Sequence, residues 1–334
     1  MIVVSTGCPA GVGPEVSVLA ASKLRGVRAV LVGDPVTLRE AADRVGVASS
    51  RLVPFDAADS KPRRGSIAVL SIGPGLAPRD RRPGRPSKAA GAAQLAYVEA
   101  AYRLAKATPG WGIVSGPVSK AAIASSGVRG AASFRGHTEW LRDRDGARHA
   151  VMCFASPRLV TSLVTTHLPL ARVPRALTRE GVSDATIELV ALLRALGKRR
   201  PLVAVASLNP HAGESELLGR EEATAILPGM AMAKSALGRA ARLTGPVGAE
   251  TAYRLALAGR YDGVVAMYHD QATIPMKLVA FGDAVNVTMG LSVVRTSVDH
   301  GTAYDIAWTG QADAGGMTAA MELAHRLTGH ARAR

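Results

Sequence analysis

Short apolar runs alternate with longer stretches rich in alanine and leucine along most of this chain of 334 residues. The apolar runs are partly β-branched, which is typical of buried strands in a parallel sheet. They lie at residues 2–5, 29–32, 67–70, 112–115, 160–165, 202–207 and 264–267. The longer stretches predict helices at residues 14–24, 89–107, 183–196, 221–237 and 250–258. This alternation predicts an α/β protein with a mostly parallel sheet and flanking helices.

Composition narrows the class of protein. The apolar fraction of 48% suits a globular protein, and the length leaves room for one large unit or two lobes. The two cysteines, Cys8 and Cys153, imply no disulfide framework and suit a cytoplasmic location. No apolar run reaches the length of a membrane span, and Met1 leads into a predicted strand without a basic leader. We therefore expect no membrane association and no signal peptide.

The formal net charge of +15 raises the question of nucleic-acid binding. The positive charges are mostly arginines scattered along the chain, and aromatic residues make up only 4%, so stacking surfaces for single strands are scarce. The densest basic stretch, residues 79–88, is rich in proline and glycine and indicates a solvated loop. We expect no nucleic-acid partner, and we attribute the charge to attraction of anionic substrates such as phosphate esters.

Three histidines, His167, His211 and His269, each follow a predicted strand. Ligands bind outside the carboxyl ends of strands in open α/β sheets, so three imidazoles delivered there can converge on one metal ion. Taken alone, each could equally be a hydrogen-bonded loop residue. The gaps of 44 and 58 residues match no short metal-ligand motif. Convergence is therefore a hypothesis about geometry.

Polar segments after the first strands allow two interpretations each. Residues 6–15 resemble a phosphate-binding turn, but they match neither G-x-G-x-x-G nor a Walker A sequence and predict mainly a tight turn into a helix. Lys120 can bind an anion or point to solvent. Thr138 can offer its hydroxyl and backbone N–H to an anionic ligand, but composition favours a helix cap.

The segment from Tyr268 onward is richer in candidate chemistry. Asp270 can orient His269, act as a base or contact a substrate. Lys277 and Arg295 suit the binding of a phosphate or carboxylate, with surface cations as the alternative. Polar residues are interleaved with apolar ones here, which indicates the wall of a site rather than a helix face.

Six segments together resemble, in order and over nearly the whole chain, the 4-hydroxythreonine-4-phosphate dehydrogenase family of vitamin B6 biosynthesis and its paralogues. They are Pro9-Ala-Gly-Val-Gly-Pro-Glu15, Ser115-Gly-Pro-Val-Ser-Lys120, Gly136-His-Thr-Glu139, Leu208-Asn-Pro-His-Ala-Gly-Glu214, Met267-Tyr-His-Asp-Gln271 and Arg295-Thr-Ser-Val-Asp-His-Gly-Thr-Ala303.

The resemblance implies a two-lobed fold like that of isocitrate and isopropylmalate dehydrogenases. It also implies a homodimer whose active sites are built from both subunits. The expected first lobe comprises residues 1–130 and about 295–334. The expected second lobe comprises about 131–294 and carries the metal ligands and dimer contacts.

The resemblance further implies the site residues. One divalent metal ion per site (Zn, Mg or Co) is expected on His167, His211 and His269. Substrate contacts are expected at His137, Thr138, Lys277, Asn286 and Arg295. Asp270 is the expected catalytic residue, as proton acceptor or amino-group contact. The oxidant is NAD or NADP, with no contact residues implied for it.

The implied reaction oxidises the C3 hydroxyl of 4-phosphooxy-L-threonine to a 3-oxo acid. Decarboxylation then gives 3-amino-2-oxopropyl phosphate, for pyridoxal phosphate biosynthesis. Three neutral imidazoles preserve the charge of the ion and leave positions open for substrate oxygens. The alternative is a paralogue that acts on 4-phospho-D-threonate or 4-phospho-D-erythronate and needs no amine contact.

Two positions depart from the family pattern. Cys8 stands where the family usually has an acidic residue, and Ser215-Glu216-Leu217 stands where it usually reads Gly-Gly-His. Neither change touches the three metal positions. Both can alter the acid or the dinucleotide that is accepted, and a family member that binds ligand without turnover is a further alternative.

Overall fold

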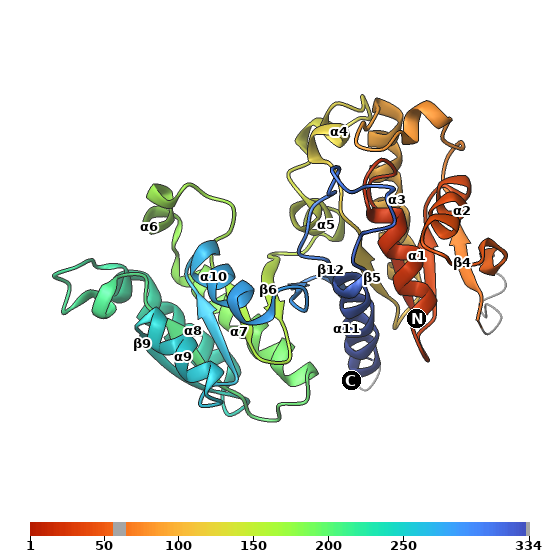
Figure 1. Cartoon of the computed structure of the whole chain (residues 1–334). Helices are drawn as coiled ribbons and strands as arrows, with labels where there is room; N and C mark the ends of the chain where they lie inside the picture. Colours follow the sequence, from red (N-terminus) through yellow and green to blue (C-terminus); the bar gives the residue numbers. More distant parts are fainter. Residues whose placement is uncertain (56–64, 332–334) are drawn as a thin grey trace. The chain divides into compact units, whose positions relative to one another are not determined.

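Two units make up the protein in the computed structural model, which describes residues 1–55 and 65–331 (Figure 1). The first unit contains residues 1–147 together with those from 291 onward, and the second contains residues 148–290. The predicted first boundary, at residue 130, lies too early. Residues 137–145 form a helix whose Leu141 is fully buried in the first unit's core beside Tyr97 and Ile113.

The first unit holds a parallel sheet in the order β3-β4-β2-β1-β5-β12. Its strands are β1 (Ile2–Ser5), β2 (Ala29–Val32), β3 (Leu52–Pro54), β4 (Ile67–Leu70), β5 (Gly112–Ser115) and β12 (Arg295–Ser297). Its helices are α1 (Gly13–Lys23), α2 (Pro35–Arg44), α3 (Lys88–Ala107), α4 (Lys120–Ala124), α5 (His137–Asp145) and α11 (Gly315–Ala331). Helix α3 packs on β1 and β5, and α11 packs on β5 and β12.

The second unit holds strands in the order β11-β6-β7-β10-β8-β9, where β6 is antiparallel to both neighbours and the other pairs are parallel. They are β6 (Val151–Ala155), β7 (Val160–Leu163), β8 (Leu202–Ala206), β9 (Arg242–Val247), β10 (Gly263–Ala266) and β11 (Val285–Met289). The helices are α6 (Val173–Ala176), α7 (Arg179–Ala195), the π-helix η6 (Glu222–Ile226), α8 (Leu227–Leu237), α9 (Ala249–Leu257) and α10 (His269–Ala280).

The predicted fold class is confirmed, since the sheets are mostly parallel and helices flank them. The elements that the pattern did not show have weak local signals. Strand β12 has three residues, and β9 is partly exposed and interrupted by Gly245-Pro246. Helix α10 contains Pro275, which removes an internal hydrogen bond. Among the described residues, no helix is both long and apolar enough to cross a membrane.

A buried carboxylate ties together two distant segments of the first unit. Asp145, at the end of α5, accepts hydrogen bonds from Lys106 Nζ and Tyr102 Oη, both at 2.8 Å. It also accepts them from the backbone N–H of Ser292, at 2.7 Å, and from the Ser292 hydroxyl. Burial opposes ionisation of Asp145, but the hydrogen bonds from Lys106 and Ser292 outweigh it and hold its pKa well below the ordinary value.

We expect Asp145→Asn to lower the free energy of unfolding of the first unit by about 2 kcal/mol at pH 7, because charged hydrogen bonds are lost. A carboxyl whose pKa is depressed in the folded state stabilises the fold above its unfolded pKa, about 4. The difference from wild type should therefore hold from pH 7 to about pH 5. It should shrink as the pH falls further toward the folded pKa. Urea unfolding across this pH range measures it, and a difference that grows on acidification would contradict the assignment.

Candidate active site

The three predicted metal histidines follow three neighbouring strands of the second unit. Strand β10 lies between β7 and β8 and runs parallel to both. His167 follows β7, His211 follows β8, and His269 follows β10 as the first residue of α10. The carboxyl ends of adjacent parallel strands share one edge of a sheet, so all three residues start from the same edge.

Hydrogen bonds fix this edge. Gln271 accepts from the backbone N–H of Met267 at 2.6 Å and donates to the carbonyl oxygen of Ser207 at 2.8 Å, which links the ends of β10 and β8. The hydroxyl of Thr165, after β7, donates to the carbonyl oxygen of Met267 at 2.7 Å. Sequence reasoning did not give Gln271 this role, because nothing in the local pattern shows which strand its amide reaches.

His167 and His269 lie together. Their ring centroids are 5.5 Å apart, and the ring planes are inclined by 42°. The Nδ1 atom of His269 lies 2.7 Å from a carboxylate oxygen of Asp270. A carboxylate on Nδ1 fixes the ring orientation and directs Nε2 outward as the atom available for a metal. Asp270 is thus placed to orient His269, one of the three roles that its sequence position allowed.

His211 lies on a loop with an unusual backbone. His211, Ala212, Glu214, Ser215 and Glu216 all have positive φ, between 43° and 71°. Left-handed conformations are costly for residues with a Cβ, and they concentrate at functional sites. The His211 side chain is 75% exposed, and its Nδ1 lies 3.1 Å from a carboxylate oxygen of Glu214.

A buried glutamate holds the start of this loop. Glu222, in the π-helix η6, is 5% exposed and accepts from the backbone N–H groups of Leu208 and Asn209 at 2.9 and 2.8 Å. The Asn209 side-chain amide also donates to Glu222, at 2.9 Å. The π-helix thus anchors the residues that precede His211. Within the described part of one chain, however, no three His, Cys, Asp or Glu side chains are grouped closely enough to hold a metal ion.

In the first unit, the predicted substrate residues meet around a buried arginine. Arg295, at the start of β12, is 3% exposed and donates to the hydroxyls of Ser115 and Thr138, each at 3.3 Å. Burial lowers the pKa of Arg295 to about 10, against the opposing effect of Glu139, so it stays cationic at neutral pH. Thr138 is not the helix cap that composition favoured. The N-cap of α5 is Gly136, which leaves the Thr138 hydroxyl for Arg295.

His137 opens α5 as a neutral imidazole. Burial lowers its pKa well below the ordinary value, and the positive charges of Arg295 and Lys120 lower it further. Its Nε2 atom is buried and has no hydrogen-bond partner among the described residues. Buried polar atoms are rarely left unsatisfied, so this atom is a candidate ligand contact. Lys120 begins the short helix α4, which Ser119 caps.

The other two predicted substrate residues belong to the second unit. Lys277 is exposed on α10. Residues 269–280 form a helix, which the sequence pattern did not indicate. Asn286, on β11, has a buried side-chain oxygen without a hydrogen-bond partner in the described chain. Like the His137 nitrogen, this oxygen is a candidate ligand contact.

The N-terminal loop proves to be a tight turn, as its sequence favoured. Glu15 is fully buried and accepts from the backbone N–H groups of Trp308 and Gly310, at 2.6 and 2.9 Å. Gly7 has φ of +78°, and a Cβ there would lie 2.3 Å from the carbonyl oxygen of Pro117. Cys8 is buried with its sulfur 3.4 Å from the hydroxyl of Tyr304. Other segments of the protein therefore pack closely against this turn.

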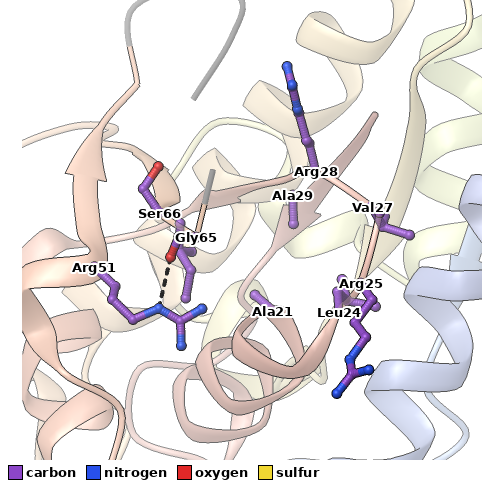
Figure 2. Close-up of a pocket in the computed structure, with 11 residues that line it drawn as sticks. Ala21, Leu24, Arg25, Val27, Arg28, Ala29, Arg51, Gly65 and Ser66 are labelled. Carbon is purple, nitrogen blue, oxygen red and sulfur yellow. Dashed lines mark hydrogen bonds between the residues drawn. The ribbon is translucent and has the colours of Figure 1, made fainter. Parts of the chain in front are cut away.

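A basic pocket of about 680 Å³ lies at the opposite, amino ends of β2 and β4 (Figure 2). Arg51 is engaged with the carbonyl oxygen of Gly65 at 2.8 Å. Figure 2 shows the guanidinium groups of Arg25 and Arg28 at opposite ends of the pocket. These groups do not converge, and none of the predicted site residues lines the pocket.

Known proteins resemble this chain over nearly its whole length. Residues 26–324 match the family model of the pyridoxal phosphate biosynthetic protein PdxA. A 4-hydroxythreonine-4-phosphate dehydrogenase of Desulfosudis oleivorans is 39% identical over 97% of this chain and 95% of its own length. A D-threonate 4-phosphate dehydrogenase of Pectobacterium atrosepticum is 37% identical over 98% and 99%.

A solved structure agrees. The crystal structure of a 4-hydroxythreonine-4-phosphate dehydrogenase from Klebsiella pneumoniae superposes with a TM-score of 0.84 at 35% identity, covering 98% of this chain and 99% of that one. These matches confirm the resemblance that the six sequence segments indicated. The chain therefore belongs to the PdxA family, and it is a dehydrogenase.

Proposed function

We propose that this protein oxidises 4-phosphooxy-L-threonine at C3 with NAD or NADP and a divalent metal ion, and that the 3-oxo acid then loses CO₂ to give 3-amino-2-oxopropyl phosphate. One observation carries the proposal. A histidine follows each of three adjacent parallel strands. In His211 and His269, the Nδ1 atom lies beside a carboxylate. Carboxylate–histidine pairs of this kind typically support metal ligands.

The donor set fits a divalent ion such as Zn, Mg or Co. Three neutral imidazoles would hold it through His167, His211 and His269, and a bound ion would supply Lewis-acid chemistry at the substrate hydroxyl and the later ketone. NAD or NADP, as the hydride acceptor, would supply the oxidising chemistry. Asp270 and Glu214 would orient their two imidazole partners through Nδ1 and leave Nε2 to face the ion.

We propose that a second copy of the chain completes the metal site, because His211 is exposed and does not join the other two histidines within one chain. Helix α10, which begins with His269, carries an apolar ridge for such a partner. Ile274, Leu278 and Phe281 recur along one helix face and are 60%, 81% and 85% exposed. Exposed apolar patches of this kind mark protein–protein contacts.

The substrate's phosphate and carboxylate need fixed positive charge and donors. In the first unit, the buried Arg295 and the hydroxyl of Thr138 supply them, and the unpartnered Nε2 of His137 offers a further contact. In the second unit, Lys277 and the buried oxygen of Asn286 are the proposed contacts. The free, buried cysteines Cys8 and Cys153 suit the proposed cytoplasmic location.

A second substrate class has support of its own. A relative of nearly equal similarity carries the name D-threonate 4-phosphate dehydrogenase. In addition, Ser215-Glu216-Leu217 changes the loop that follows His211. We therefore keep 4-phospho-D-threonate and 4-phospho-D-erythronate as the alternative.

The deciding experiment offers 4-phosphorylated threonine, threonate and erythronate stereoisomers with NAD and with NADP. Reduced nicotinamide and CO₂ are measured together. We expect both products from 4-phosphooxy-L-threonine. Turnover of the threonate or erythronate alone would shift the function to the alternative, and failure of every pair would indicate a member that only binds.

Replacement of Asp270 tests its proposed orienting role. We expect Asp270→Asn to weaken metal affinity by about 10- to 100-fold, because the Nδ1 partner of His269 loses its charge. Activity should return in part at saturating metal. A base with direct contact to the substrate would instead leave metal affinity unchanged and depress turnover at every metal concentration. Metal titration by calorimetry, beside kcat at each metal level, separates the two roles.

A further inference from the structure

A groove of about 700 Å³ lies in the first unit and shares no lining residue with the proposed metal or substrate contacts. Its sides come from the segment 72–77 that follows β4, from residues 128–129, and from α5. Helix α3 forms its floor. All of its described lining residues belong to the first unit, and none of them has a role in the metal or substrate binding proposed above.

The floor is flat and apolar. Ala89, Ala92, Ala93 and Ala96 all line the groove, and their spacing places them on one face of α3. Alanine methyl groups fill little of the space above a helix, so a planar group can lie against this face. From Ala92 onward the backbone N–H groups of α3 bond within the helix, so this part of the floor offers no free backbone donor.

One wall is aromatic and held in place by hydrogen bonds. The guanidinium of Arg144 lies 4.5 Å from the ring centroid of Trp140. Glu99 accepts from Trp140 Nε1 and from Arg144 Nε, each at 3.2 Å, and from Arg103 at 3.3 Å. These contacts orient the indole in the absence of a ligand. The two arginines also balance the negative charge of Glu99.

The rim is basic. Four arginines line the groove (Arg79, Arg103, Arg129 and Arg144) against two carboxylates, Asp80 and Glu99. Arg129 is exposed and has no carboxylate within ion-pair distance in the part of the chain that the structure describes. An occupant therefore needs negative charge at one end.

We propose that this groove binds an adenine nucleotide, with the base between the alanine floor and the wall formed by the stacked Arg144 and Trp140, and the phosphate toward the arginine rim. A flat floor, an aromatic wall and guanidinium groups match a planar heterocycle that carries a phosphate. The same adenosine phosphate chemistry occurs in free nucleotides and in one half of NAD or NADP. Both are sources for the ligand.

Calorimetry with AMP on the full chain tests the site at physiological salt. We expect one saturable site per chain. Ala96→Phe should abolish binding because the ring fills the groove, and Arg129→Glu should weaken binding at least tenfold. Arg39→Glu makes the same charge change on an exposed residue of α2, outside the groove, and should leave the affinity unchanged. Thermal unfolding of each variant checks that the fold is kept.

Wild-type protein without AMP binding, or equal binding in Ala96→Phe, overturns the proposal. Repeating the titration in saturating NAD identifies the source, since the groove takes the adenosine half of the dinucleotide if NAD blocks AMP and a free nucleotide if it does not. The measurement needs neither metal nor turnover. A failed substrate panel and a failed AMP titration are therefore separate results.

Discussion

Mixing two inactive variants, His211→Ala and His269→Ala, is expected to restore dehydrogenase activity. Each variant alone should lose activity by about 1,000-fold or more, because the proposed metal site would lack one of its three ligands. If two chains share the site as proposed, one site of a mixed dimer receives His167 and His269 from one chain and His211 from the other, so all its ligands are intact. Random assortment makes half of the dimers mixed, with one good site in two. Activity should therefore reach about a quarter of the wild-type value.

The control uses the same chemistry with a different pair. His167 and His269 lie side by side in one chain, with ring centroids 5.5 Å apart. Mixing His167→Ala with His269→Ala leaves every site short of one ligand and should restore nothing. The variants are mixed under conditions that allow subunits to exchange, and bound metal and turnover are measured before and after. Recovery of activity in the control pair, or no recovery in the first pair, would contradict a metal site shared between two chains.

The pattern of apolar residues predicted where the three histidines lie relative to the strands, but not how their side chains are arranged. Buried apolar runs located β7, β8 and β10, and the rule for parallel sheets placed the residues that follow them at one edge. The left-handed backbone around His211 has no such signal, because positive φ in residues with a Cβ is set by tertiary contacts. Glu222, which holds the preceding residues, lies in a helix whose sequence does not reveal what it contacts.

Local rules also failed where tertiary structure overrode them. The sequence pattern did not predict α10, because the helix contains Pro275 and proline normally ends a helix. The first lobe was expected to end near residues 129–135, a stretch with glycine, alanine and serine, yet Trp140 and Leu141, which follow it, pack into the first unit's core. Long motifs shared with a family were more informative than propensity at these positions.

The departures from the family pattern acquire a physical meaning in the structure. Ser215 and Glu216 stand where the family usually has two glycines, and their φ values are 56° and 71°. Glycine adopts this conformation without strain, whereas serine and glutamate there cost about 1 kcal/mol each. The loop after His211 thus keeps a glycine-like path with side chains added. Those side chains are available to change which substrate is accepted.

Replacement of Arg295 should have the second-largest effect. Its guanidinium is 3% exposed, donates to Ser115 and Thr138, and lies beside the unpartnered Nε2 of His137, whose pKa it helps to lower. We expect Arg295→Ala to reduce kcat/KM for 4-phosphooxy-L-threonine by about 100- to 1,000-fold, because removal of a buried charge partner costs several kcal/mol. Most of the loss should lie in KM. Arg295→Lys should recover only part of it, since lysine lacks the planar fork of donors.

Substrate affinity measured by calorimetry, beside KM and kcat, tests this role. Arg135→Ala, an exposed arginine of the same unit, is the matched control and should change KM little. Because the pKa of Arg295 is about 10, the wild-type contribution of this charge should stay constant from pH 6 to 9 and fall only above that range. An Arg295→Ala variant that keeps its fold and its wild-type KM would show that the anionic groups of the substrate bind elsewhere. The substrate contact that the family resemblance implies for Arg295 would then be wrong. The test of the shared metal site by mixing variants does not depend on this result.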